Sequence, residues 1–247
     1  MRKQREYKTP YSCSFSLQHP EPNAKMAFLL LFVMLTACAA SPQDLSGQVF
    51  TFPEETNTTY VRLNASVQSF SAVTVCLRFI TDLSRSHSLF SLATPSAANA
   101  FQIRTDPVSS GFIVFVNNRV VRFWGLNYTP NRWHSICSTW DGDSGLVRLW
   151  FDSESTVSKF AGGTGISEPV IILGQDQDSL GGRFQARQSF VGMLSNVHMW
   201  DYTLSACEIQ NYVDDLNFGL GNVLNWRALE FKATGRVLLE DKMLACH

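Results

Sequence analysis

The residues of this 247-residue chain that are best suited to chemistry are oxygen donors that follow a short apolar segment. Asp176, Gln177 and Asp178 lie in the loop directly after that segment, and Gln185 and Gln188 lie further along the same connection. Ca²⁺ takes about six to eight oxygen ligands from carboxylate, amide and main-chain carbonyl groups. If the apolar segment is a strand that ends at a sheet edge, these oxygens can converge there without burial. The spacing therefore favours a calcium site, and the competing interpretation is a solvated acidic loop.

Catalytic arrangements have little support in the sequence. Segment 142–145 (GDSG) imitates the nucleophile motif of trypsin-like proteases, but Leu146 replaces the second glycine and no Ala-Ala-His-Cys segment precedes it. A glycoside hydrolase needs two carboxylates that flank a cleft, whereas Asp176 and Asp178 are near neighbours on one connection. The histidines lack the H-x-x-x-H spacing that is typical of metal sites. We therefore expect a protein that is not an enzyme and has no catalytic residues.

The composition is that of a folded and nearly neutral protein. Apolar residues make up 45% of the chain and charged residues 17%, and the formal net charge is −1. With 20 Lys and Arg against 21 Asp and Glu, no overall positive field would attract nucleic acid. Nucleic acid is therefore not expected as a primary ligand.

Segment 26–40 (MAFLLLFVMLTACAA) is interpreted as a secretory signal peptide. It follows Lys25, carries no charge and ends in small residues that suit cleavage near Ala40. A membrane span needs about 20 apolar residues, so no membrane anchor is expected and the mature protein is predicted to be extracellular. Residues 1–25 are too long and polar for the start of a signal and are interpreted as an untranslated or atypical extension. This leaves residues 41–247 as a single domain.

Three Asn-X-Ser/Thr motifs lie in polar, turn-like settings of that domain. They begin at Asn57, Asn64 and Asn127. Each motif alone is weak evidence, because a chain of this length contains some by chance. Together with the signal peptide they predict an extracellular glycoprotein.

The mature domain keeps four cysteines, and an even number in an oxidising compartment favours disulfides. They are Cys76, Cys137, Cys207 and Cys246. None of them has the C-x-x-C spacing of a zinc ribbon or a redox dithiol. Four cysteines allow three connectivities, and the residues alone do not choose among them. Cys207 and Cys246 could bridge each other, and Cys246 could instead link subunits.

The elements that position these residues are mostly short and extended. Apolar runs and turn signals predict strands within 72–81, 111–124, 133–140, 146–151, 170–173 and 190–199. One helix is predicted after Ser205, where Glu208 completes a capping box and Ile209, Tyr212, Val213 and Leu216 have helical spacing. Many short strands with one helix predict an all-β antiparallel sandwich.

Five stretches resemble the pentraxin family, in particular its short secreted members. They are 50–56 (FTFPEET), 73–81 (VTVCLRFIT), 135–140 (SICSTW), 170–205 and 223–229 (VLNWRAL). The resemblance covers essentially all of residues 44–230. It implies a jelly-roll sandwich of the concanavalin and laminin-G type, a disulfide between Cys76 and Cys137, and five protomers in a ring.

The resemblance also implies up to two calcium ions per subunit. Asp176 and Asp178 would bridge the two ions, the main-chain oxygen of Gln177 would bind one, and Gln188 would bind the second. The full set of candidate metal ligands is Asn99, Asp176, Gln177, Asp178, Gln185 and Gln188.

The chain departs from the family pattern at several of these positions. Ala98-Asn99 stands where the family has Asp-Asn, and Gln185 stands where the family has Glu. Because affinity in such loops follows the charge of the ligands, we expect weakened calcium binding. Arg104 and Val120 occupy the positions of the apolar and acidic residues that hold choline in the family. Arg104 is therefore a candidate ligand-binding residue for phosphate, sulfate or carboxylate, and the competing interpretation is a strand arginine that faces solvent.

The function that follows is recognition without catalysis. We expect a secreted, calcium-dependent, lectin-like pattern-recognition protein of innate immunity and the acute phase. As a homopentamer it would bind anionic phosphate or carbohydrate groups on microbial or damaged-cell surfaces by multivalency, and complement is a further partner that the resemblance implies. The main alternative is a laminin-G-like adhesion module without calcium dependence, because 190–197 (FVGMLSNV) fits that class as well. A glycoside hydrolase on the same sandwich is the second alternative.

Overall fold

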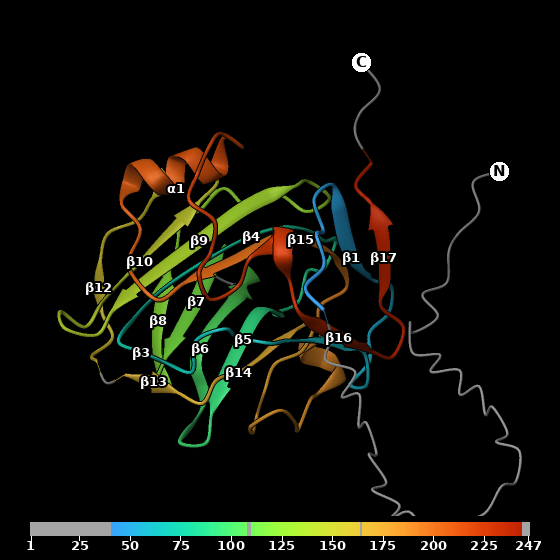
Figure 1. Cartoon of the computed structure of the whole chain (residues 1–247), viewed down its shortest axis with the longest axis horizontal. Coiled ribbons are helices and arrows are strands. Elements are labelled where there is room, and N and C mark those ends of the chain that lie inside the picture. The colour runs from blue at the N-terminus through green and yellow to red at the C-terminus, as the bar shows by residue number, and fades with distance from the viewer. Residues whose placement is uncertain (1–40, 108–109, 164, 244–247) are drawn as a thin grey trace, which may run out of the picture.

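Two antiparallel sheets pack face to face in the computed structural model, which describes residues 41–107, 110–163 and 165–243 (Figure 1). Residues 1–40 lie outside the described residues, and so do the proposed extension and signal peptide. Among helices of the described part, none is both long and apolar enough to span a bilayer.

The first sheet has eight strands and carries the disulfide. In spatial order its strands are β11 (Glu154–Ser155), β10 (Leu146–Phe151), β9 (His134–Asp141), β4 (Ala72–Ile80), β15 (Gly192–Trp200), β1 (Gln48–Phe52) and β17 (Leu238–Asp241), with β12 (Lys159–Phe160) also paired to β10.

The second sheet has seven strands and carries the candidate site. Its order is β16 (Phe231–Thr234), β2 (Tyr60–Leu63), β14 (Val170–Leu173), β5 (Ser88–Thr94), β6 (Ala97–Asp106), β7 (Gly111–Val116) and β8 (Arg119–Phe123). A separate short pair joins β3 (Ser69–Phe70) to β13 (Ile166–Ser167). The helical elements that lie wholly within the described residues are α1 (Ala206–Val213) and two 3₁₀ turns, η2 (Ala186–Gln188) and η3 (Trp226–Ala228).

The predicted hairpin over 111–124 forms because its turn residues tolerate positive φ. Asn117 and Asn118 have φ values of 47° and 65°, which is the backbone of a two-residue turn between β7 and β8. Asparagine visits this region more readily than most residues because its short side chain can hydrogen-bond locally. The strand at 72–81 and the hairpin over 133–151 are likewise confirmed.

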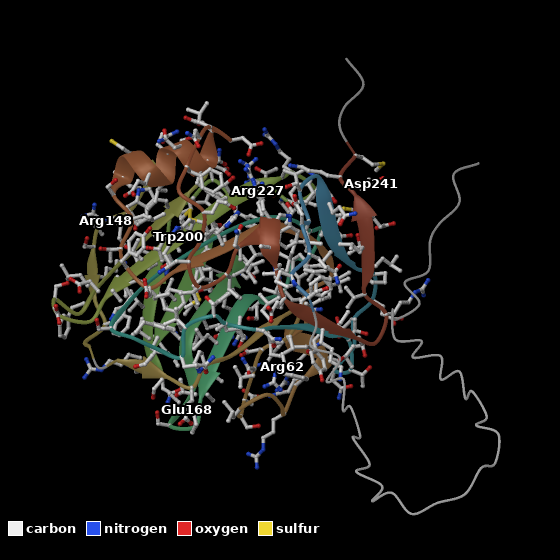
Figure 2. All side chains as sticks on the ribbon, in the orientation of Figure 1. Arg62, Arg148, Glu168, Trp200, Arg227 and Asp241 are labelled. Carbon is white, nitrogen blue, oxygen red and sulfur yellow. A yellow bond between two sulfur atoms is a disulfide. The ribbon has the colours of Figure 1, made fainter. Side chains whose placement is uncertain are left out.

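Apolar side chains from both sheets form the main core between the layers. Phe50, Phe79 and Phe101 are fully buried there. A second apolar cluster lies on the outer face of the first sheet, beneath α1, and contains Trp200 and Tyr212 (Figure 2). The first sheet is therefore apolar on both faces, which explains why β4 is buried along nearly its whole length.

Helix α1 begins as the sequence predicts and ends earlier. The Ser205 hydroxyl accepts a hydrogen bond from the Glu208 amide, and the Glu208 carboxylate accepts one from the Ser205 amide. The Arg78 guanidinium donates to the carbonyls of Tyr212 and Val213 at the other end of the helix. The prediction that Leu216 belongs to this helix was wrong: the helix stops at Val213, and Leu216 is exposed.

Candidate functional site

The candidate site is the loop of residues 174–190, which leaves β14 and returns to β15. A hydrogen bond of 3.0 Å from the Phe190 amide to the Gly174 carbonyl closes its ends. Gly174 has a φ of 89°, and a Cβ there would lie 2.3 Å from the Phe52 ring, so another residue would be strained and crowded. The start of the loop is thereby fixed against the core.

Two buried glutamine side chains hold the loop against the second sheet. The Gln177 amide nitrogen donates to the carbonyls of Ser91 and Val170, and its oxygen accepts from the Gly181 amide. The Gln175 amide nitrogen donates to the carbonyls of Thr56 and Thr59. The side chain of Gln177 is therefore used to shape the loop, which leaves its main-chain oxygen as the group suited to a metal.

The far end of the loop is held by Arg85. Its guanidinium donates to the carbonyls of Arg187 and Ser189 and pairs with the Glu55 carboxylate at 2.9 Å. Because both ends and the middle of the loop are fixed, its remaining polar groups are held in a defined arrangement.

Asp176 lies under the loop against the outer face of β6. Its Oδ1 accepts a hydrogen bond of 2.5 Å from the Gln102 amide, and its Oδ2 pairs with Arg104 Nη1 at 3.1 Å. Arg104 therefore does not face solvent as an isolated strand arginine. Both of its described polar contacts are internal, since its Nε donates to the Ser86 hydroxyl at 2.8 Å.

Opposing effects act on the pKa of the Asp176 carboxyl group. Burial raises the pKa of its carboxyl group, and the nearby charge of Asp178 acts in the same direction. The Arg104 guanidinium and the Gln102 hydrogen bond lower this pKa but do not reverse the net rise. Arg104 is thus the positive partner that offsets part of the cost of ionising this buried group.

In the outer part of the loop Gln185 contacts Asp178, and Gln188 is linked to Gln185 through a main-chain hydrogen bond. The Gln185 amide nitrogen donates to Asp178 Oδ2 at 2.5 Å, and the Gln185 oxygen accepts from the Arg187 guanidinium. The amide oxygen of Gln188 is buried and accepts no hydrogen bond within the described residues. A buried acceptor of this kind is costly unless something positive approaches it, so this part of the loop fits a cation.

The main chain of Asn99 is bound to Asn118. Its main-chain N–H donates to the Asn118 side-chain oxygen at 3.0 Å, and its main-chain carbonyl accepts from the Asn118 main-chain N–H at 2.9 Å. Both bonds tie it to the turn between β7 and β8. In the described part of the chain, no group of three or more His, Cys, Asp and Glu side chains could hold a metal ion, so a cation at the loop would need amide and main-chain carbonyl oxygens in addition to a carboxylate.

An apolar strip runs beside the site on the outer face of the second sheet. Register places Gln102 opposite Phe115, and Phe115 opposite Val120. Ile113 lies opposite Arg104 in the same way. Ile113 and Phe115 are partly exposed, and Val120 is 43% exposed. The partners of Gln102 and Arg104 on β7 are therefore apolar, and we name Ile113, Phe115 and Val120 the apolar strip.

Sequence reasoning missed Gln102, which contributes the second contact to Asp176. The available signal was the alternation along β6, which puts Phe101 and Ile103 in the core and Gln102 and Arg104 on the other face. Two long polar residues at that spacing in an otherwise apolar strand indicate a polar partner on the outer face.

The disulfide between Cys76 and Cys137 is confirmed and joins register partners on the neighbouring strands β4 and β9. Cys207 is exposed and makes no disulfide within the described residues, and Cys246 lies outside them. The three candidate glycosylation residues are all exposed and lie outside the strands: Asn57, Asn64 and Asn127.

The structure thus defines a jelly-roll sandwich with a helix on one outer face and a polar loop on the other. The Pentaxin family model (also spelled pentraxin) matches residues 48–241. C-reactive protein of Xenopus laevis is 40% identical over 222 residues, which cover 87% of this chain and 91% of that protein. Human C-reactive protein is 39% identical over 225 residues, with 88% and 99% covered.

A second kind of relative agrees with these matches. Serum amyloid P-component of Rattus norvegicus is 36% identical over 225 residues, which cover 88% of this chain and 96% of that protein. Among solved structures, the heptameric SAP-like pentraxin from Limulus polyphemus superposes with a TM-score of 0.72 at 22% identity, covering 79% of this chain and 95% of that one. The chain belongs to the pentraxin family, whose members are recognition proteins and not enzymes.

Proposed function

We propose that this protein recognises anionic ligands through calcium held by the 174–190 loop. The observation that carries the proposal is the buried Gln188 amide oxygen, which, like the Gln175 amide oxygen on the same loop, has no hydrogen-bond donor among the described residues. An unpaired buried acceptor beside a carboxylate-bearing loop is the arrangement expected where a cation binds.

The residues that would hold the ion are Asp178, Gln188, Gln185 and the main-chain oxygen of Gln177. Gln185 would turn its amide so that the oxygen, which now accepts from Arg187, replaces the nitrogen beside Asp178. Asn99 would join this set through its side-chain oxygen, since its hydrogen bonds to Asn118 use only its main chain. Bound calcium supplies a positive charge with open coordination positions for a phosphate or carboxylate oxygen of the ligand.

The apolar strip indicates what the rest of the ligand is like. Val120 supplies no negative charge beside the site, so a choline-like cation has no partner there. An anionic group joined to an uncharged or apolar moiety fits this surface better. Arg104 adds a positive charge near the same place, although that charge is already paired with Asp176.

Multivalency would make weak individual sites effective. The similar proteins include one described as heptameric, which supports a homo-oligomer for this chain as well, and we propose a pentamer. The loop lies outside the second sheet and α1 lies outside the first, so a ring in which every protomer has the same orientation presents all its loops on one side. Linked sites of this kind gain avidity of about 10²–10⁴ over a single site.

The extracellular setting belongs to the same proposal. The described disulfide suits an oxidising compartment, and the exposure of Asn57, Asn64 and Asn127 leaves all three open to glycosylation. We propose secretion, a role in innate immunity and the acute phase, and complement as a partner of the assembled ring.

The test is capture of the purified protein on agarose that carries phosphate monoesters, in millimolar calcium and in chelator. The expected result is retention in calcium and release by chelator. Asp178→Asn should abolish retention, whereas Arg62→Gln, which changes an exposed arginine of β2 on the same sheet (Figure 2), should leave it intact. Retention that is indifferent to chelator would contradict the proposal and favour the calcium-independent adhesion module.

A further inference from the structure

We infer that Arg104 is a built-in replacement for one of the two cations that the family resemblance implies, so that each chain binds one calcium ion. The inference rests on the calcium-dependent function proposed above. Arg104 Nη1 lies 3.1 Å from Asp176 Oδ2, and the two side chains are 23% and 4% exposed. A fixed guanidinium therefore stands beside the carboxylate that the resemblance assigns to both ions.

Both carboxylate oxygens of Asp176 are already engaged by side chains. Gln102 donates to Oδ1 and Arg104 donates to Oδ2. A buried carboxylate is stable when it is paired with a charge and its remaining lone pairs accept hydrogen bonds. Asp176 therefore does not need a metal ion to be ionised in the folded protein.

The guanidinium is positioned by a chain of contacts that does not involve the loop. Arg104 Nε donates to the Ser86 hydroxyl at 2.8 Å, and that hydroxyl donates to the Thr105 carbonyl at 2.5 Å. Gln102 is fixed in a similar way, since its amide nitrogen also donates to the Ser88 hydroxyl. These contacts orient both donors toward Asp176 before any ion is present.

A second divalent ion at Asp176 would stand close to this positive charge. Repulsion between a divalent ion and a guanidinium about 6 Å apart corresponds to about tenfold in Kd even at the dielectric constant of bulk water. The absence of a carboxylate at Ala98 removes a charge that would have offset it. The Asp178 carboxylate has no such arginine contact within the described residues. Buried amide oxygens without a donor occur both at Gln102, beside Asp176, and at Gln188, so the arginine is what distinguishes the two carboxylates.

The experiment is calcium titration of the full assembled protein by calorimetry and equilibrium dialysis. The wild type should bind about one ion per chain. Arg104→Gln frees Asp176 and should bind calcium at least about tenfold more tightly or take up a second ion. Arg62→Gln removes an exposed arginine from the same sheet and should behave as the wild type. Two ions on the wild type, or an unchanged titration for Arg104→Gln, would overturn the inference while leaving the proposed function intact.

A second variant separates an effect on calcium binding from destabilisation of the fold. Arg104→Gln/Asp176→Asn removes both charges, so no unpaired carboxylate remains buried. It should melt in chelator at a higher temperature than Arg104→Gln alone and should still bind about one calcium ion. Loss of calcium binding in this double variant would show that Asp176 carries the ion in the wild type, and the inference would be wrong. Absence of calcium binding by every variant would overturn both the inference and the calcium dependence of the proposed function.

Discussion

Removing the Cys76–Cys137 disulfide should lower the free energy of unfolding by about 4 kcal/mol. The two half-cystines are register partners on β4 and β9 and are 61 residues apart in the sequence. In the chain-entropy model, a loop of that length corresponds to about 14 cal/mol/K, or about 4 kcal/mol at 25 °C. The bridge lies in the buried cluster beneath α1, so its loss should weaken the packing of the helix on the sheet as well as the pairing of the two strands.

The assay is urea and thermal unfolding of Cys76→Ala/Cys137→Ala beside the wild type. For a domain of this size, 4 kcal/mol corresponds to a fall in melting temperature of about 8 to 16 °C. Cys207→Ala is the matched control because that thiol is exposed and unbridged in the described structure, and it should change stability by less than about 0.5 kcal/mol. A double variant that loses less than about 1 kcal/mol would refute the view that this bridge stabilises the sandwich by restricting the unfolded chain.

Three further outcomes are expected from named contacts. Ser205→Ala should destabilise the protein by about 1 kcal/mol in urea unfolding, because the capping box with Glu208 is lost; an unchanged midpoint would contradict this. Burial lowers the pKa of His134, but its hydrogen bonds to Asp152 and to the Thr129 carbonyl, together with the charge of Asp152, outweigh this and leave the pKa above its usual 6.5. That stabilisation is therefore complete below pH 6.5 and is lost as pH rises through the folded pKa, so melting temperatures between pH 6 and 8 should fall less steeply in Asp152→Asn than in the wild type; equal slopes would argue against it. Calcium at about 100 times its Kd should stabilise the wild type by about 2.7 kcal/mol, and Asp178→Asn should lose this gain while keeping its stability in chelator.

The sandwich could be predicted because its signals are local. An asparagine pair that tolerates positive φ, a capping box and alternating apolar residues each specify one element without reference to distant contacts. The helix end at Val213 could not be read in this way. Arg78 on β4 donates to the last carbonyls of the helix. Because Arg78 lies 134 residues from Tyr212 in the sequence, no pattern within the helical segment indicates this contact.

The contacts within the candidate site could not be predicted from the sequence. That Asp176, Asp178, Gln185 and Gln188 bind calcium stays a prediction. The pairing of Arg104 with Asp176 depends on where the loop folds back over β6. That approach is a tertiary contact between residues 72 positions apart, which spacing within either segment cannot reveal.

The most direct measurement is a crystal structure of the assembled protein soaked in calcium. The account predicts one ion in contact with Asp178 and the Gln188 amide oxygen, with the Arg104–Asp176 ion pair retained beside it. A loop without any ion at saturating calcium, together with capture on phosphate agarose that does not respond to chelator, would contradict the central claim that this loop recognises anions through a bound metal.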